Sequence, residues 1–81
     1  MSLSDTLKLT RQRVFLTQED FATAMHVSVA TINRWENGHS KPNMTAMKNL
    51  KAFCESNNLP FEEIEKEWLK KGYNSSSQIE D

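Results

Sequence analysis

Residues 28–37 carry the side chains with the most distinctive chemistry in this 81-residue sequence. At about 3.6 residues per helical turn, Ile32 and Trp35 fall on one side of a helix, and smaller or polar side chains fall on the other. The residues on that second side are Val29, Ala30, Asn33, Arg34 and Asn37. Arginine can bind guanine through two hydrogen bonds, asparagine can bind adenine likewise, and small side chains permit close approach to the major groove of DNA. The pattern therefore suits a DNA-reading helix, with an ordinary solvated helix face as the alternative.

Residues for catalysis or metal binding are sparse elsewhere in the sequence. The single cysteine, Cys54, cannot close an internal disulfide, and with His26 and His39 it gives too few ligands, too irregularly spaced, for structural zinc. The sequence shows no glycine-rich phosphate loop and no pair of carboxylates suited to acid–base work. We therefore expect no enzymatic activity, no metal and no cofactor, and we expect Cys54 to lie in the core.

Length and composition fit one small folded domain. With 37% hydrophobic and 26% charged side chains, 81 residues can bury a single core. No apolar run approaches the roughly 20 residues that span a bilayer, and the amino terminus lacks the layout of a secretory signal. We therefore expect a soluble, cytoplasmic protein that does not contact a membrane.

The net charge of −1 conceals an uneven distribution of charged side chains. Residues 6–54 carry seven basic side chains against three acidic ones, a balance of +4, whereas residues 55–81 carry a balance of −4. A basic segment can face the phosphates of DNA while an acidic segment faces away. Ordinary solvated helix faces would give the same distribution.

Apolar residues recur at every third or fourth position, which predicts an all-α fold of five helices. The second helix is expected to open at Thr17 with a capping box to Asp20, the third after the N-cap Ser28, and the fourth at Met44 or Thr45. The residues expected to face inward are Leu3, Leu7, Val14, Phe21, Ala22, Met25, Ile32, Trp35, Met47, Leu50, Phe53, Cys54, Phe61, Ile64, Trp68 and Leu69.

Glycine and proline mark the remaining boundaries. Gly38 should follow the end of the third helix, Pro60 should lie in the first turn of the fifth, and Gly72 should lie just past its end. The folded domain is thus expected over residues 1–72, with a flexible polar tail over residues 73–81. Only a few residues around His26 separate the second and third helices, so residues 17–38 have the spacing of a helix-turn-helix.

The chain resembles the lambda-repressor-like, Cro/CI-type helix-turn-helix family, also called XRE, over residues 7 to about 54. The matching run at residues 16–38 reads LTQEDFATAMHVSVATINRWENG, and Lys41 and Pro42 follow it. The resemblance implies a five-helix lambda-repressor-like domain whose third helix enters the major groove of double-stranded DNA. It also implies a small, repressor-like transcriptional regulator that binds a near-palindromic operator as a weak homodimer.

The family pattern, carried over position by position, implies a role for each matching residue. The base-reading residues would be Val29, Ala30, Arg34 and, as a fourth candidate, Asn33. The phosphate contacts would be Gln18, Asn37 and, more generically, Lys41, Asn43 and Arg13. Arg11 and Glu36 would form a structural ion pair, which withdraws that arginine from phosphate.

Two residues depart from the family pattern, because His26 and Phe15 stand where glycine is usual. The turn at His26 requires a positive φ, which histidine adopts more readily than β-branched residues do. Phe15 alters only the local path between the first two helices, and we expect it to cover an edge of the core.

The acidic fifth helix leaves a second function open. Its apolar stripe of Phe61, Ile64 and Trp68 can close the core against the first helix, form a dimer seam, or bind a protein partner. A partner there would suit a protein-interaction module, such as the DNA-binding antitoxin of a toxin–antitoxin pair.

Overall fold

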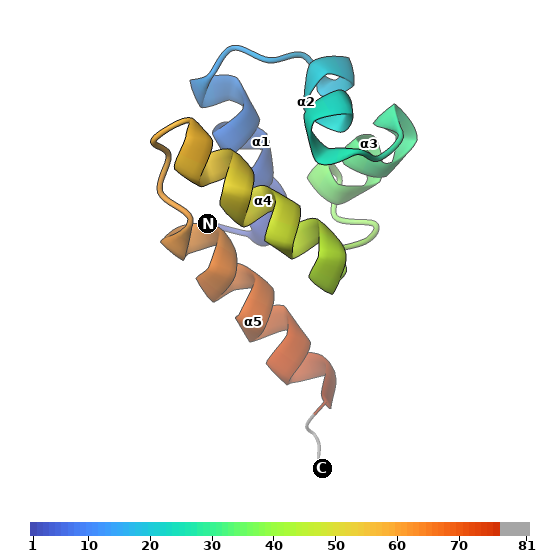
Figure 1. The fold of residues 1–81 in the computed structure, drawn as a ribbon. Helices are drawn as coiled ribbons and strands as arrows, with labels where there is room; N and C mark the ends of the chain where they lie inside the picture. Colours follow the sequence, from blue (N-terminus) through green and yellow to red (C-terminus); the bar gives the residue numbers. More distant parts are fainter. Residues whose placement is uncertain (77–81) are drawn as a thin grey trace.

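Five helices form the fold in a computed structural model that describes residues 1–76, with side chains described through residue 70 (Figure 1). No strand occurs within residues 1–76, so the predicted all-α, five-helix architecture is confirmed. Figure 1 shows α2 and α3 together on one side of the bundle, α4 crossing in front of α1, and α5 at the opposite end. The helices are α1 Leu3–Arg13, α2 Gln18–Met25, α3 Val29–Glu36, α4 Met44–Ser56 and α5 Glu62–Ser76.

Side-chain caps fix the starts of α2, α3 and α4. Thr17 accepts a hydrogen bond from the Asp20 amide at 3.1 Å, and the Asp20 carboxylate accepts one from the Thr17 amide at 3.4 Å. This is the predicted capping box, and Ser28 caps α3 as predicted. The side chain of Asn43 accepts from the Ala46 amide at 2.9 Å, which starts α4 at Met44.

The same C-terminal motif ends α1, α2, α3 and α4. In each, a residue with positive φ lies just past the helix, and the amides of that residue and of the following one donate to carbonyls in the last turn of the helix, as in a Schellman motif. The positive-φ residues are Phe15 (59°), His26 (61°), Gly38 (77°) and Asn58 (55°). The prediction of a left-handed His26 is therefore confirmed, whereas the matching conformation of Phe15 was not foreseen.

The bounds of α5 differ from the prediction at both ends. Pro60 precedes the helix instead of lying in its first turn, because α5 begins at Glu62, after Phe61 accepts its first backbone hydrogen bond. The helix continues past Gly72 to Ser76. Residues 77–81, most of the predicted flexible tail, lie outside the described residues, so that part of the prediction remains untested.

The core lies between all five helices and matches the predicted inward faces closely. Its buried hydrophobic residues are Leu3, Leu7, Phe21, Ala22, Met25, Ile32, Trp35, Ala46, Met47, Leu50, Cys54 and Ile64. The helix α5 packs against α1, and Ile64 of its apolar stripe is fully buried, whereas Phe61 and Trp68 are half-buried against the core. Leu69 was expected inward but is 53% exposed.

Two threonines of α1, Thr6 and Thr10, are also buried, although their polarity hid them from the apolar pattern. Their hydroxyls donate to backbone carbonyls one turn earlier, each at 2.8 Å, which satisfies them inside the core. Cys54 is fully buried as expected. Burial raises the pKa of its thiol to about 11, with a smaller contribution from the charge of Glu55.

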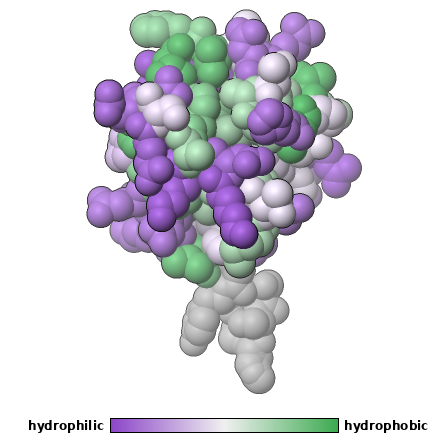
Figure 2. Space-filling view, in the orientation of Figure 1, coloured by the Kyte–Doolittle hydropathy of each residue, from purple (hydrophilic) through white to green (hydrophobic). Residues whose placement is uncertain are grey.

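Phe15 does not cover the core. Its side chain is 93% exposed, because the left-handed backbone that turns the chain from α1 into α2 directs the side chain outward. Figure 2 shows the face of the molecule that is turned to the viewer in Figure 1, with hydrophilic side chains spread over it and hydrophobic ones in smaller patches. None of the described helices is long and apolar enough to cross a membrane.

Candidate nucleic-acid interface

The helix α3 has one buried face and one exposed face. Ile32 is fully buried and Trp35 is 4% exposed, so these two side chains hold the helix on the core. All four residues with an expected base-reading role are exposed: Val29, Ala30, Asn33 and Arg34. Within the described side chains no ion pair occupies the Arg34 guanidinium, which leaves all its donors available to a ligand.

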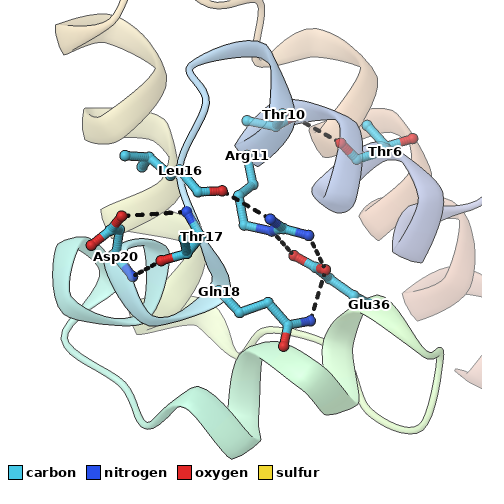
Figure 3. Close-up of polar contacts among 8 residues, drawn as sticks. All are labelled: Thr6, Thr10, Arg11, Leu16, Thr17, Gln18, Asp20 and Glu36. Carbon is cyan, nitrogen blue, oxygen red and sulfur yellow. Dashed lines mark hydrogen bonds and ion pairs between the residues drawn. The ribbon is translucent and has the colours of Figure 1, made fainter.

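An ion pair between Arg11 and Glu36 joins α1 to α3 (Figure 3). Arg11 Nε lies 2.7 Å from Glu36 Oε2, and Nη2 lies 2.9 Å from Oε1, a two-bond contact. Arg11 Nη1 also donates to the carbonyl of Leu16 at 2.9 Å. Hydrogen bonding to Glu36 raises the pKa of Arg11 above its ordinary value.

The two side chains of this pair are withdrawn from solvent, with exposures of 12% for Arg11 and 3% for Glu36. Because the carboxylate neutralises the guanidinium, Arg11 contributes little positive charge to the outer surface. Its geometry fits the structural role that the sequence predicts for it.

Gln18, the first residue of α2, donates from Nε2 to Glu36 Oε1 at 3.0 Å. Figure 3 shows this amide reaching the carboxylate from the side opposite Arg11. Since an ionised carboxylate only accepts, the amide orientation is determined, and the second N–H of Nε2 remains free. The amino-terminal position in α2 adds the positive end of the helix dipole beside it.

Asn33 and Asn37 also form a pair, because Asn37 Nδ2 donates to Asn33 Oδ1 at 3.0 Å. Asn37 is the C-cap of α3, and the backbone carbonyls at this end of the helix are unpaired. They favour the orientation in which the side-chain Nδ2 group of Asn37, and not its oxygen, points toward α3. The side-chain oxygen of Asn33 thereby already accepts one hydrogen bond, and its Nδ2 group is the part most open to an external partner.

The loop between α3 and α4 holds Lys41 and Asn43. Both are exposed, but Asn43 Oδ1 is engaged in capping α4, so only its Nδ2 can reach a phosphate. Lys41 Nζ lies over the Trp68 ring, 5.4 Å from its centroid. A hydrogen bond also joins this loop to α5, because Trp68 Nε1 donates to the Pro42 carbonyl at 2.6 Å.

Arg13 is not brought together with the other basic candidates. It lines a groove with Leu9, Pro60 and Glu63, between α1 and the start of α5. That groove belongs to the α1–α5 side of the bundle, whereas Gln18 and the exposed residues of α3 belong to α2 and α3.

Two positioning contacts were not predicted from the sequence. The first is the bond between Gln18, which was expected to contact phosphate, and Glu36, which was expected to pair with Arg11. The Trp68–Pro42 bond joins residues separated by the whole of α4. No local pattern signals either contact, because each depends on how distant helices pack.

A family model described as helix-turn-helix matches residues 7–64, well over half of the chain. No curated protein and no solved structure matches the sequence. The matched residues include all of α1 to α4 from Leu7 onward and end at Ile64, so they stop before Trp68 and Leu69.

Proposed function

Because the chain belongs to the XRE, lambda-repressor-like family of helix-turn-helix DNA-binding regulators, we propose that it reads a specific double-stranded DNA sequence with α3. The observation that carries this proposal is the division of α3. Ile32 and Trp35 anchor the helix in the core, and the opposite side presents Arg34, Asn33 and two small residues to solvent. Such a face fits the major groove, where bases are distinguished by hydrogen bonds and methyl contacts.

Each side chain of this face has a role that its geometry supports. Arg34 is suited to guanine, because its donors can bind O6 and N7 together. Val29 and Ala30 are suited to apolar contact with a thymine methyl group. Asn33 offers Nδ2, whereas its oxygen already accepts a bond from Asn37, so it is best suited to an acceptor such as guanine O6 or a purine N7.

The phosphate contacts of the proposal surround α3. Gln18 offers its free N–H at the amino end of α2, and Asn37 offers its remaining N–H at the end of α3. Lys41 and Asn43 extend the contact along the loop. We leave Arg13 out, because it lies with Pro60 and Glu63 in a different groove.

We propose that the protein acts as a repressor. We also propose that it binds a near-palindromic operator as a weak homodimer, which fits a regulator of this family. The surface for a second copy is the groove between α4 and α5, where Met44 is 62% exposed and Leu69 is 53% exposed. Lys48, Lys51 and Glu65 line the same groove, so a two-fold axis could pair unlike charges. Sedimentation of wild type and Leu69→Glu on saturating palindromic DNA tests this, and wild-type protein that stays monomeric there would contradict it.

The exposed apolar residues of this groove also favour the second candidate, an antitoxin-like module whose protein partner covers α5. Deleting residues 60–81 would not test it, because Ile64 is fully buried and its loss would damage the core. Capture of one stoichiometric protein by the full chain, abolished in Leu69→Glu and retained in Lys66→Glu, would support the module. A regulator of either kind must reach its DNA, which agrees with the cytoplasmic location that the sequence predicts.

Selection of bound sites from random duplex DNA tests the main proposal directly. We expect one enriched motif with inverted half-sites, and an affinity that falls with salt by a log–log slope of about 0.9 for each phosphate contacted. Arg34→Glu should abolish enrichment, whereas Lys66→Glu, the same charge reversal at an exposed position of α5, should leave the motif unchanged. Affinity that does not change across a salt titration would overturn the proposal.

A further inference from the structure

Trp68 lies outside the residues matched by the family model, yet it contacts the loop that follows α3 at two points. Its indole Nε1 donates to the Pro42 carbonyl at 2.6 Å, and its ring lies beneath Lys41 Nζ. We propose that Trp68 is a positioning residue for DNA binding, which holds the Lys41 ammonium in place to contact a phosphate. This inference rests on the proposed DNA-binding function and adds to it a role for α5.

The hydrogen bond fixes the loop itself. Pro42 is among the fully buried residues, and its carbonyl has the Trp68 indole as its partner. An indole N–H can only donate, so this bond has a single direction and a defined geometry. The loop runs only from the end of α3 at Glu36 to the start of α4 at Met44. Anchoring Pro42 therefore restricts the backbone on which Lys41 stands.

The ring contact fixes the charge without cancelling it. A cation over an aromatic face is attracted by the ring quadrupole, and the ring carries no net negative charge. The N–H groups of Lys41 that point away from the ring remain free for a phosphate. Arg11 shows the contrast, because its guanidinium is bonded and neutralised by Glu36. Of these two basic side chains, Lys41 is held in position with its charge still available.

Trp68 also lines the groove between α4 and α5, together with Met44 and Leu69. A molecule that covers this groove therefore touches the residue that holds the DNA-contacting loop. The groove and the DNA interface are connected through one side chain.

The test uses Trp68→Phe, which keeps an aromatic ring but removes the N–H donor, and Lys41→Gln, which removes the charge. Each protein is titrated with its selected duplex over a range of salt concentrations. Lys41→Gln should reduce the magnitude of the log–log salt slope by about 0.9 per bound protomer. Trp68→Phe should also reduce the magnitude of this slope. In the wild-type protein, Trp68→Phe should weaken DNA binding by about two- to fivefold per protomer. In a protein that already carries Lys41→Gln, the same change should weaken binding by much less.

Phe61→Leu serves as the matched control, because Phe61 is a half-buried aromatic of the same groove whose side chain has no hydrogen-bonding group to hold the loop. It should leave the salt slope at the wild-type value. Equal effects of Trp68→Phe in both backgrounds would overturn the inference. Wild-type binding with no salt dependence would instead remove the proposed function and the inference together.

Nuclear magnetic resonance keeps the inference testable if Trp68→Phe folds poorly. In the wild-type protein the ε-methylene protons of Lys41 should be shifted upfield by the Trp68 ring current, both free and bound to DNA. The shift should be retained in Phe61→Leu. Loss of the upfield shift on DNA binding would show that Lys41 leaves the ring to reach DNA, and the positioning role would then be wrong.

Discussion

Gln18 and Glu36 are joined by a hydrogen bond of 3.0 Å, which links the first residue of α2 to the last residue of α3. The same Glu36 oxygen accepts from Arg11 at 2.9 Å, so one carboxylate holds three helices in register. The consequence is that the amide expected to contact phosphate is oriented by a residue that also joins α1 to α3. Glu36 thus holds the ion pair with Arg11 and also orients the amide that we propose as a phosphate contact.

Glu36→Gln should destabilise the fold by about 3 kcal/mol, because it leaves the Arg11 guanidinium only 12% exposed and without a counter-charge. Urea unfolding followed by circular dichroism measures this cost. Lys70→Gln breaks the ion pair between Lys70 and Glu67 within α5, in which Lys70 is 57% exposed, and should cost less than about 1 kcal/mol. Equal costs for the two variants would mean that the Arg11–Glu36 pair contributes no more than a surface pair.

Arg34→Ala and Gln18→Ala should weaken DNA binding in different ways. Arg34→Ala should cost about 1–3 kcal/mol on the preferred site and relax discrimination at one base pair of each half-site. Gln18→Ala should weaken all sequences to a similar extent, because a phosphate contact carries no direct sequence information. Binding to libraries of single-base variants separates these outcomes. A uniform loss with unchanged preferences in Arg34→Ala would make Arg34 a backbone contact.

Asn37→Asp should change which bases are preferred opposite Asn33. Aspartate cannot donate, so the Asn33 amide must turn to donate to it and would present Oδ1 to the groove. We expect the preference to move toward adenine N6 or cytosine N4, which are donors. Site selection with the variant measures this shift, whatever the new negative charge does to overall affinity. An unchanged motif would show that the pair does not govern base choice.

Phe15→Gly and His26→Gly should each stabilise the fold by about 0.5–1 kcal/mol. Both residues have positive φ, which glycine adopts without the steric cost, and the exposed Phe15 side chain loses no packing. Thermal or urea unfolding measures the gain. Lys8→Gly, in the middle of α1, is the control and should destabilise by about 1 kcal/mol. Destabilisation by His26→Gly would indicate that the imidazole makes a stabilising contact.

Cys54 should resist thiol reagents at pH 8 while the protein is folded and react once it is unfolded. Its pKa is raised to about 11, so the buried thiol stays protonated where a solvent-exposed thiol begins to ionise. The raised value favours the folded state at lower pH, and this contribution is lost as pH rises from about 9 to about 11. Reaction rates with a chromogenic disulfide check the first expectation, and urea unfolding at several alkaline pH values checks the second. Rapid labelling of the folded chain would contradict the burial.

The sequence by itself determined the features that depend on neighbouring residues. Helical periodicity gave five helices and the buried faces of α3 and α4, and local capping residues gave the starts at Thr17 and Ser28. The family resemblance added the paired roles of Arg11 and Glu36, which the structure shows in contact. These features were accessible because spacing and cap chemistry act within one or two turns.

Tertiary structure alone decided the features that depend on how distant helices meet. The bond from Gln18 to Glu36, the contact of Trp68 with Pro42 and the separate groove of Arg13 have no local signal. The positive φ of Phe15 belongs with them, because phenylalanine itself does not favour a left-handed cap, although the family usually has glycine at this position. Local propensity favours other conformations for such a residue, and the turn that closes α1 and leads into α2 requires this one.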